Sequence, residues 1–224
     1  MIALSPYDLL RIARAAGVTT SEAIDRFTIR RGSILKFNDH GTCALLEGSR
    51  CGVHRGRPLA CRLYPLGIER DEAGRAERFI TLEPAAGSLG VYGDDGTVND
   101  FLDAQNVGAH LEANDRYASL LPIYRERIAA TVDFERLLPR EFWQRAVREA
   151  LAESGYDPNP LIDAMFDPDR FGCARVSDAD AISEHLEILI EMIRREMNPD
   201  ALAAAAVMLA VSLGYSPSEV TIDC

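Results

Sequence analysis

Residues 43–65 read CALLEGSRCGVHRGRPLACRLYP and contain three of the five cysteines of the chain, at the spacing C-x7-C-x9-C. A cysteine thiolate binds metal ions or reacts as a nucleophile, so Cys43, Cys51 and Cys61 predict a soft-metal site for zinc or an iron–sulfur cluster. The spacing matches none of the standard zinc or ferredoxin patterns. The alternative is that these are unrelated small core residues, because a free cysteine is among the most buried residue types.

The same stretch is a basic island in an acidic protein. It holds four arginines, at positions 50, 55, 57 and 62, and one acid, Glu47, whereas the whole chain has a net charge of −11. Cationic neighbours lower the pKa of a thiol, so the arginines predict stabilised thiolates or an anionic ligand; local variation in charge is the alternative. The overall acidity argues against binding to nucleic acid or to an anionic membrane, both of which need a basic surface.

The composition is that of an ordinary soluble globular protein: 224 residues, 47 % hydrophobic and 26 % charged. The longest apolar run covers residues 201–213, which is shorter than the roughly 18 residues of a membrane-spanning helix. The N-terminus lacks a basic region followed by an apolar core. We therefore expect a cytoplasmic protein with reduced or metal-bound thiols rather than a disulfide framework.

Local signals predict the elements around the cysteines. Ser5 as N-cap and the following proline predict a helix over residues 5–17, ended by Gly17. The pattern T-x-x-E at residues 19–22 is a capping box for a second helix that ends near residue 27. Strands are predicted at 32–37 and 43–46, a short helix at 57–65, and a β-hairpin from 66–70 and 76–82.

The rest of the chain is predicted to be helical. We expect helices from residue 97 to about 110, from about 112 to 130 with a kink or break at Pro122, and over 139–153, 160–166, 178–197 and 199–213. No β-α-β rhythm is present, so the fold class is α+β rather than a parallel sheet. The chain divides into a cysteine-cluster region, residues 1–96, and a helical region, residues 97–224.

A structural zinc site needs four ligands and a cubane cluster about four thiolates, so the three cysteines leave one position to fill. His54 is the nearest candidate, through a ring nitrogen, although a surface role for this histidine stays open. Cys173 is expected to be an inert thiol, and Cys224 lies at the chain end. A nucleophilic pair of Cys51 or Cys61 with His54 would be a catalytic alternative, but no third orienting residue accompanies it.

The stretch resembles the YkgJ-type cysteine-cluster family, which chelates zinc or iron. That family has a cysteine, then a C-x-[IV]-[YH] segment, then R-P-x-x-C-R-x-[YF]-P; here these are Cys43, residues 51–54 and residues 57–65. Residues 3–16 and 91–105 are also similar, so the resemblance covers about residues 1–110. It implies a metal site, in which Arg57 and Arg62 donate hydrogen bonds to sulfurs or to backbone carbonyls; ion pairs with the acidic helical part are the alternative.

The chain departs from that family at two places. Members carry a C-x-x-C-C-like cluster before the first helix, and longer members have a cysteine where this chain has residues 87–90, GSLG. One explanation is a start codon farther upstream. The resemblance leaves three functions open: a metal- or cluster-binding protein without established catalysis, a relative of the flagellin lysine-N-methylase, and a degenerate member that keeps the fold without metal. Neither a nucleic acid nor a membrane is an expected partner, and a protein partner is unknown.

Overall fold

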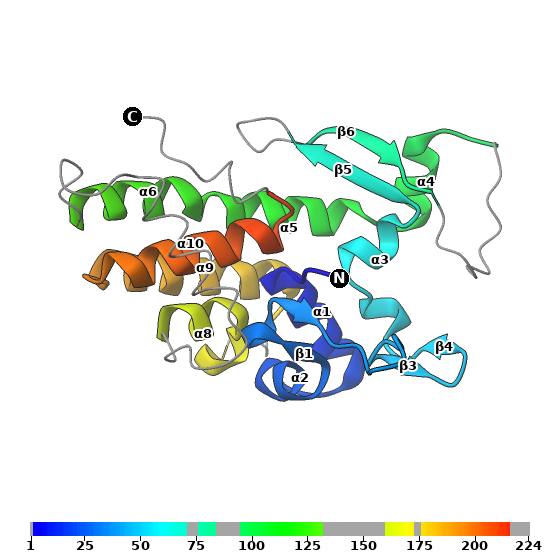
Figure 1. Cartoon of the computed structure of the whole chain (residues 1–224), viewed down its shortest axis with the longest axis horizontal. Coiled ribbons are helices and arrows are strands. Elements are labelled where there is room, and N and C mark those ends of the chain that lie inside the picture. Colours follow the sequence, from blue (N-terminus) through cyan, green and yellow to red (C-terminus); the bar gives the residue numbers. More distant parts are fainter. Residues whose placement is uncertain (1, 71–75, 84–94, 132–159, 173–175, 216–224) are drawn as a thin grey trace.

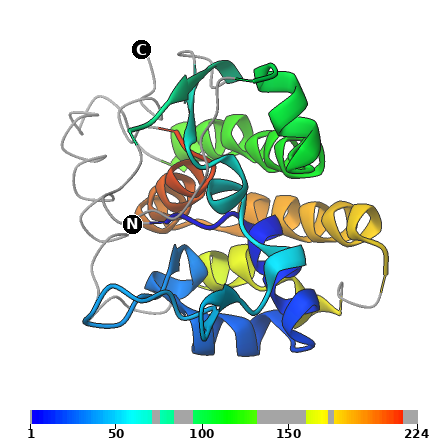
Figure 2. The same cartoon turned by 90° about the vertical axis from the view of Figure 1, so that its right-hand side faces the viewer.

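A computed structural model describes residues 2–70, 76–83, 95–131, 160–172 and 176–215. It is a mixed α+β structure, as predicted, with small antiparallel sheets in its N-terminal part and helices after them. Figures 1 and 2 show a stack in which the long helices run through the middle, the first two helices lie on one side, and a β-hairpin lies on the other. Of the predicted elements, the helix over 139–153 lies outside the described residues, as do Cys173 and Cys224.

The N-terminal part contains α1 (Pro6–Ala16), α2 (Thr20–Phe27), the strands β1 (Thr28–Ile29) and β2 (Ile34–Leu35), and the 3-10 turn η1 (Arg30–Gly32) between them. It continues with β3 (Leu46–Glu47), β4 (Arg50–Cys51), η2 (His54–Gly56), α3 (Leu59–Leu63), β5 (Leu66–Arg70) and β6 (Ala76–Thr81). The helical part contains α4 (Val98–Ala104), α5 (Gly108–Ala118), α6 (Leu120–Thr131), α8 (Pro160–Phe166), η3 (Pro168–Phe171), α9 (Asp178–Arg195) and α10 (Pro199–Ser212).

The caps predicted for the first two helices are confirmed. Ser5 and Thr19 each accept a hydrogen bond from the backbone three residues on, and an acid at that position binds back, which completes a capping box in both cases. Gly17 ends α1 in the left-handed conformation, which a glycine adopts without steric cost. These short-range bonds fix both helix starts.

The strands are shorter than predicted, except in the second hairpin. The strand expected over 32–37 is reduced to β2, because the chain forms η1 just before it. The strand expected over 43–46 is reduced to a single antiparallel bridge between Phe37 and Cys43, after which β3 begins at Leu46. Cys43 therefore lies directly before the β3–β4 hairpin. The predicted hairpin is confirmed: β5 and β6 are antiparallel, and Leu66 pairs with Thr81.

Two differences occur in the helical part. The helix expected to reach residue 110 ends at Ala104, because Asn106 adopts a positive φ of 51° and α5 then starts at Gly108. The break expected at Pro122 lies at Ser119 instead. Pro122 is in the first turn of α6, where a backbone N–H has no partner within the helix, so its missing donor costs little.

One main hydrophobic core contains residues from both sides of residue 96, the expected boundary between the two regions. Leu9 and Ile12 of α1 pack in it with Tyr124 of α6, Phe166 of α8 and Leu209 of α10, all at most 1 % exposed. A smaller cluster beneath the β5–β6 hairpin contains Leu59, Leu63 and Val107. The segment that carries Cys61 therefore lies between the main core and the hairpin.

Two polar networks tie the helices together. The carboxylate of Asp178, in the first turn of α9, accepts hydrogen bonds from Tyr7, Arg11 and Arg14, all on α1. Although burial alone would raise the pKa of Asp178, the hydrogen bond and charge of Arg11 and the charge of Arg14 keep it below its usual value. Deeper in the core, Tyr117 lies 2.8 Å from Nδ1 of His185.

Among the described helices, none is both long and apolar enough to cross a membrane.

Candidate metal centre

The segment around Cys61 is built by the R-P-x-x-C-R-x-Y-P motif. Pro58 caps α3 in an extended conformation, and its carbonyl accepts hydrogen bonds from the N–H groups of Cys61 and Arg62. Tyr64 ends the helix and is followed by a cis peptide bond to Pro65. The predicted short helix is therefore confirmed, with the Cys61 side chain partly buried on it.

Arg62 holds this segment to its neighbours. The side chain is 7 % exposed, and its guanidinium donates to three backbone carbonyls: Arg57 at 3.0 Å, Gln105 at 2.7 Å and Arg55 at 2.7 Å. A planar guanidinium with five N–H groups suits such a set of acceptors. Of the two roles that the sequence left open for Arg62, donation to backbone carbonyls is the observed one.

The segment docks on α1 through a glycine and an aspartate. A Cβ atom on Gly56 would lie 2.2 Å from the carbonyl oxygen of Arg11, so only a glycine allows η2 to approach the helix this closely. Asp8, in the first turn of α1, accepts a hydrogen bond of 2.9 Å from the N–H of Leu59 at the start of α3. Burial raises the pKa of Asp8, despite the hydrogen bonds that it accepts from Ser5 and Leu59.

Cys43 forms the bridge to Phe37, and Cys51 ends strand β4. Both are partly buried against the main core. The sulfur of Cys43 accepts a contact of 3.4 Å from the N–H of Leu45, and Cys51 pairs with Leu46 across the β3–β4 hairpin. Phe37 and Leu46, which pair with the two cysteines, are 39 % and 43 % exposed. Both cysteines are therefore near the surface.

The thiols of Cys43 and Cys61 are each influenced by neighbouring thiols. Burial, together with the nearby Cys43, Asp8 and Cys51, raises the pKa of Cys61 to about 12. Burial also raises the pKa of Cys43, with an added contribution from Cys51. Charges interact over about 10 Å, so the side chains at 43, 51 and 61 lie in the same part of the molecule, but within the described residues they do not form a group close enough to hold a metal.

The expected lowering of the thiol pKa values by the arginines does not occur at Cys43 and Cys61. Arg57 lowers the pKa of Cys61, but burial together with the neighbouring thiols outweighs this effect. The other arginine of the motif, Arg62, is committed to backbone carbonyls. Cys61 is therefore protonated at neutral pH, and a metal ion would have to displace its proton.

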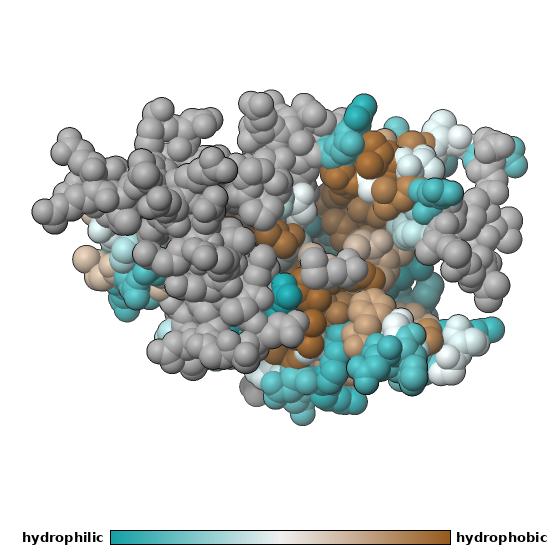
Figure 3. Space-filling model, in the orientation of Figure 1, coloured by the Kyte–Doolittle hydropathy of each residue, from teal (hydrophilic) through white to brown (hydrophobic). Residues whose placement is uncertain are grey.

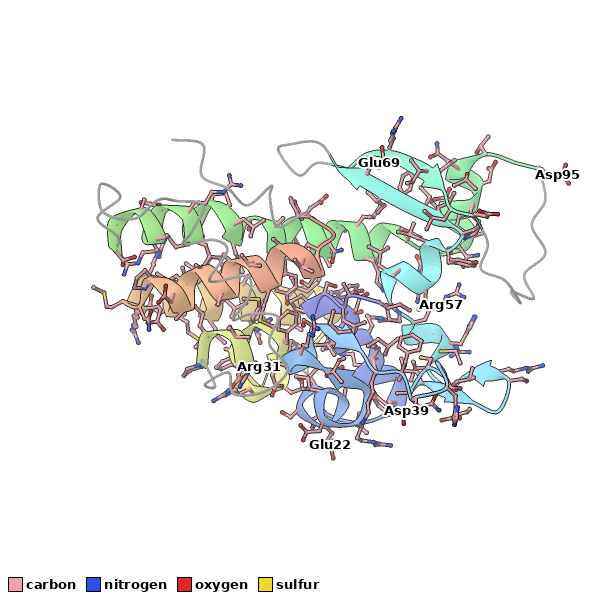
Figure 4. All side chains as sticks on the ribbon, viewed as in Figure 1. Glu22, Arg31, Asp39, Arg57, Glu69 and Asp95 are labelled. Carbon is pink, nitrogen blue, oxygen red and sulfur yellow. The ribbon has the colours of Figure 1, made fainter. Side chains whose placement is uncertain are left out.

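His54 is placed at the surface next to Arg57. Its Nε2 lies 3.1 Å from Nη1 of Arg57, whose second amino group also donates to the side chain of Gln105. Figure 4 shows Arg57 where the chain passes from η2 into α3. Because arginine can only donate, Nε2 must be the acceptor and Nδ1 must carry the proton of the neutral ring. In this arrangement neither ring nitrogen of His54 has a lone pair available for a metal.

The thiols of Cys43, Cys51 and Cys61 are ligands that suit zinc or iron, but their side chains do not yet form a closed metal site. Within the described residues, no group of three or more histidine, cysteine or acidic side chains is close enough to hold a metal. Cys43, Cys51 and Cys61 would supply thiolates to zinc or iron. Closing a site would require them to approach one another and a further ligand to join them.

Sequence reasoning missed three residues of this region. Asp8 is 51 positions away from its partner Leu59, and Gln105 is 43 positions from Arg62. His110, on α5, is 3 % exposed, and its Nε2 lies 3.7 Å from Oδ1 of Asp8. An acid at the third position of a helix signals only a capping box, so nothing local revealed these contacts.

The chain matches no protein-family model, no curated protein and no solved structure.

Proposed function

We propose that the chain is a metal-binding protein that takes zinc or iron through Cys43, Cys51 and Cys61. The observation that carries the proposal is the placement of the partly buried Cys43 and Cys51 around Leu46, whose N–H bonds to the carbonyl of Cys43 and which pairs with Cys51. The influence of both cysteines on the pKa of Cys61 supports it. Membership of the YkgJ-type cysteine-cluster family and a cytoplasmic location are parts of the same proposal. Its support is the match of residues 43–65 to the pattern of that family.

The role of the rest of the motif is to hold Cys61 in place. Arg62 fixes α3 through three carbonyls, and Asp8 fixes its first N–H. Such supporting hydrogen bonds orient metal ligands and tune their basicity. The fourth position is open to a water molecule, or to His54 if that ring leaves Arg57. When bound, the metal would supply a positive charge that keeps the thiols deprotonated.

The experiment is elemental analysis of protein purified without oxygen. We expect zinc or iron in near-stoichiometric amount in the wild-type protein and its loss in the Cys51→Ser/Cys61→Ser variant. Cys173→Ser is the matched control, because it removes a thiol that lies outside residues 43–65, and it should retain the metal. Negligible metal in all three proteins would overturn the proposal and favour the degenerate member that keeps the fold without metal.

A further inference from the structure

Leu46 links Cys43 to Cys51 at the β3–β4 hairpin. The N–H of Leu46 donates to the carbonyl of Cys43 at 3.0 Å, which closes a four-residue turn, and Leu46 pairs with Cys51 across the hairpin. The adjacent N–H of Gly52 donates to the carbonyl of Leu45, so Leu46 and Cys51 form a non-hydrogen-bonded pair, the type with the closer side chains. One turn and one strand pair therefore bring the two cysteines near each other.

These contacts limit the distance between the two cysteines. The turn keeps the Cα atoms of Cys43 and Leu46 within about 7 Å, and a non-hydrogen-bonded pair holds those of Leu46 and Cys51 about 4.5 Å apart. A disulfide needs Cα atoms separated by about 4.4–6.8 Å. Closing one between Cys43 and Cys51 therefore requires a shift of at most about 5 Å, in a hairpin whose strands have two residues each.

The hairpin lies at the edge of the molecule. Figure 1 shows β3 and β4 at the right-hand edge, away from the long helices, and Figure 3 shows hydrophilic and hydrophobic residues side by side on this corner. Both cysteines are partly exposed, and Leu46 between them is 43 % exposed. Arg50 and Gly52, the neighbours of Cys51, are exposed as well. A small oxidant can therefore reach Cys51, and the guanidinium of Arg50 attracts one that is anionic.

The segment that carries Cys61 is fixed more firmly than the hairpin. It is the helix α3, in which Arg62 donates to three backbone carbonyls and the first N–H binds Asp8 of α1. Moving Cys61 would break these bonds, whereas the β3–β4 hairpin can shift without breaking them. Cys43 and Cys51 should therefore react with each other in preference to Cys61.

We propose that Cys43 and Cys51 are a redox pair that closes into a disulfide by exchange with an anionic small-molecule disulfide, for which glutathione disulfide is the probe. The thiolate of Cys51 attacks one sulfur of the small disulfide, forming a mixed disulfide and releasing one small thiolate. The thiolate of Cys43 then attacks Sγ of Cys51, forming the protein disulfide and releasing the second small thiolate. The two cysteines lose two electrons and two protons, and the small disulfide gains them as two thiols.

The disulfide bears on the function proposed above without depending on it. The oxidised form lacks two of the three thiolates of the proposed metal site, so oxidation would release the ion. The exchange itself needs no metal. Its test therefore uses metal-free protein, and its failure would leave the metal-binding proposal to the elemental analysis described above.

The test is mass mapping of tryptic peptides after the reduced, metal-free full chain has been incubated with glutathione disulfide. Cleavage after lysine and arginine places the three cysteines on separate peptides, residues 37–50, 51–55 and 56–62. We expect the link between 37–50 and 51–55 to exceed any link to 56–62 by at least about tenfold, because disulfide geometry is specific. Comparable links to 56–62, a reaction that stops at the mixed disulfide, or no reaction would overturn the proposal.

Unfolded wild-type protein and two variants show whether the fold selects this pair. In concentrated urea the loops closed by 43–51 and 51–61 links are of similar length, so both links should form in similar amounts. Cys43→Ser should stop at the mixed disulfide on peptide 51–55, and Cys61→Ser should form the 43–51 link as the wild type does. The same distribution of links in folded and unfolded protein would refute the assignment, because the fold would then play no part in it.

Discussion

Replacement of Arg62 by methionine tests whether this residue joins the cysteine-bearing segment to the rest of the fold. Methionine keeps most of the unbranched side chain, and removes the guanidinium with its hydrogen bonds to the carbonyls of Arg55, Arg57 and Gln105. The position is 7 % exposed, so water can replace the lost donors only partly. The substitution therefore leaves buried acceptors without partners.

The magnitude follows from the three bonds. A hydrogen bond to a charged group contributes about 1.5–3 kcal/mol, but contributions within one group are not additive. We expect Arg62→Met to lower the free energy of unfolding by about 3–5 kcal/mol, similar to breaking one partner of a buried polar network. For a chain of this size, that corresponds to a fall in Tm of roughly 6–20 °C.

The assay is urea denaturation followed by circular dichroism at pH 7. Arg55→Met is the matched control: it makes the same substitution at an exposed neighbour, and should change the unfolding free energy by no more than about 0.5 kcal/mol. Arg62→Lys should lie between the wild type and Arg62→Met, because an ammonium reaches fewer of the three carbonyls. Equal stability of Arg62→Met and Arg55→Met would refute the structural role assigned to this arginine.

Four further outcomes are expected. Gly56→Ala should destabilise the protein by at least about 2 kcal/mol because its Cβ would contact the backbone of α1, whereas Gly108→Ala, with open space at that position, should be neutral or slightly stabilising in the same urea assay. The pKa of His185 is about 4 in the fold, below its ordinary 6.5, chiefly because of burial. The folded state therefore binds fewer protons than the unfolded chain in this range, so stability should fall by up to about 3 kcal/mol as the pH drops from 6.5 to 4, and His185→Gln should show a shallower dependence. His54→Ala should retain the metal because Arg57 holds that ring in the wild type, and loss of metal from this variant would identify the histidine as the fourth ligand. Because the pKa of Cys61 is raised to about 12, a competition assay should show the apparent zinc affinity falling at least about tenfold for each unit of pH lowered; a flat dependence would mean that this thiol does not bind.

The sequence predicted the features whose signals are local. The capping boxes at Ser5 and Thr19, the αL glycine at position 17 and the β5–β6 hairpin each depend on residues within a few positions of one another. For the same reason the α+β class and the short helix around Cys61 were predictable. The position of the break between α5 and α6 was not predictable from Pro122, because a proline is tolerated in the first turn of a helix.

The environment of the thiols depends on contacts between distant residues, which no local pattern reveals. The arginine content of residues 43–65 suggested thiols of lowered pKa, but Arg62 is bonded to carbonyls, one of them 43 positions away. Burial then raises the pKa of Cys61. The buried carboxylate of Asp8, which adds to this effect, belongs to a helix that looked like a simple capping box in the sequence.

The most direct measurement of the central claim is X-ray absorption at the metal edge of protein purified without oxygen. If Cys43, Cys51 and Cys61 hold the ion, the spectrum of the wild type will contain about three sulfur neighbours at roughly 2.3 Å, and Cys61→Ser will lose one of them. A first shell made only of oxygen and nitrogen atoms would contradict the assignment, as would sulfur neighbours that stay unchanged in Cys61→Ser.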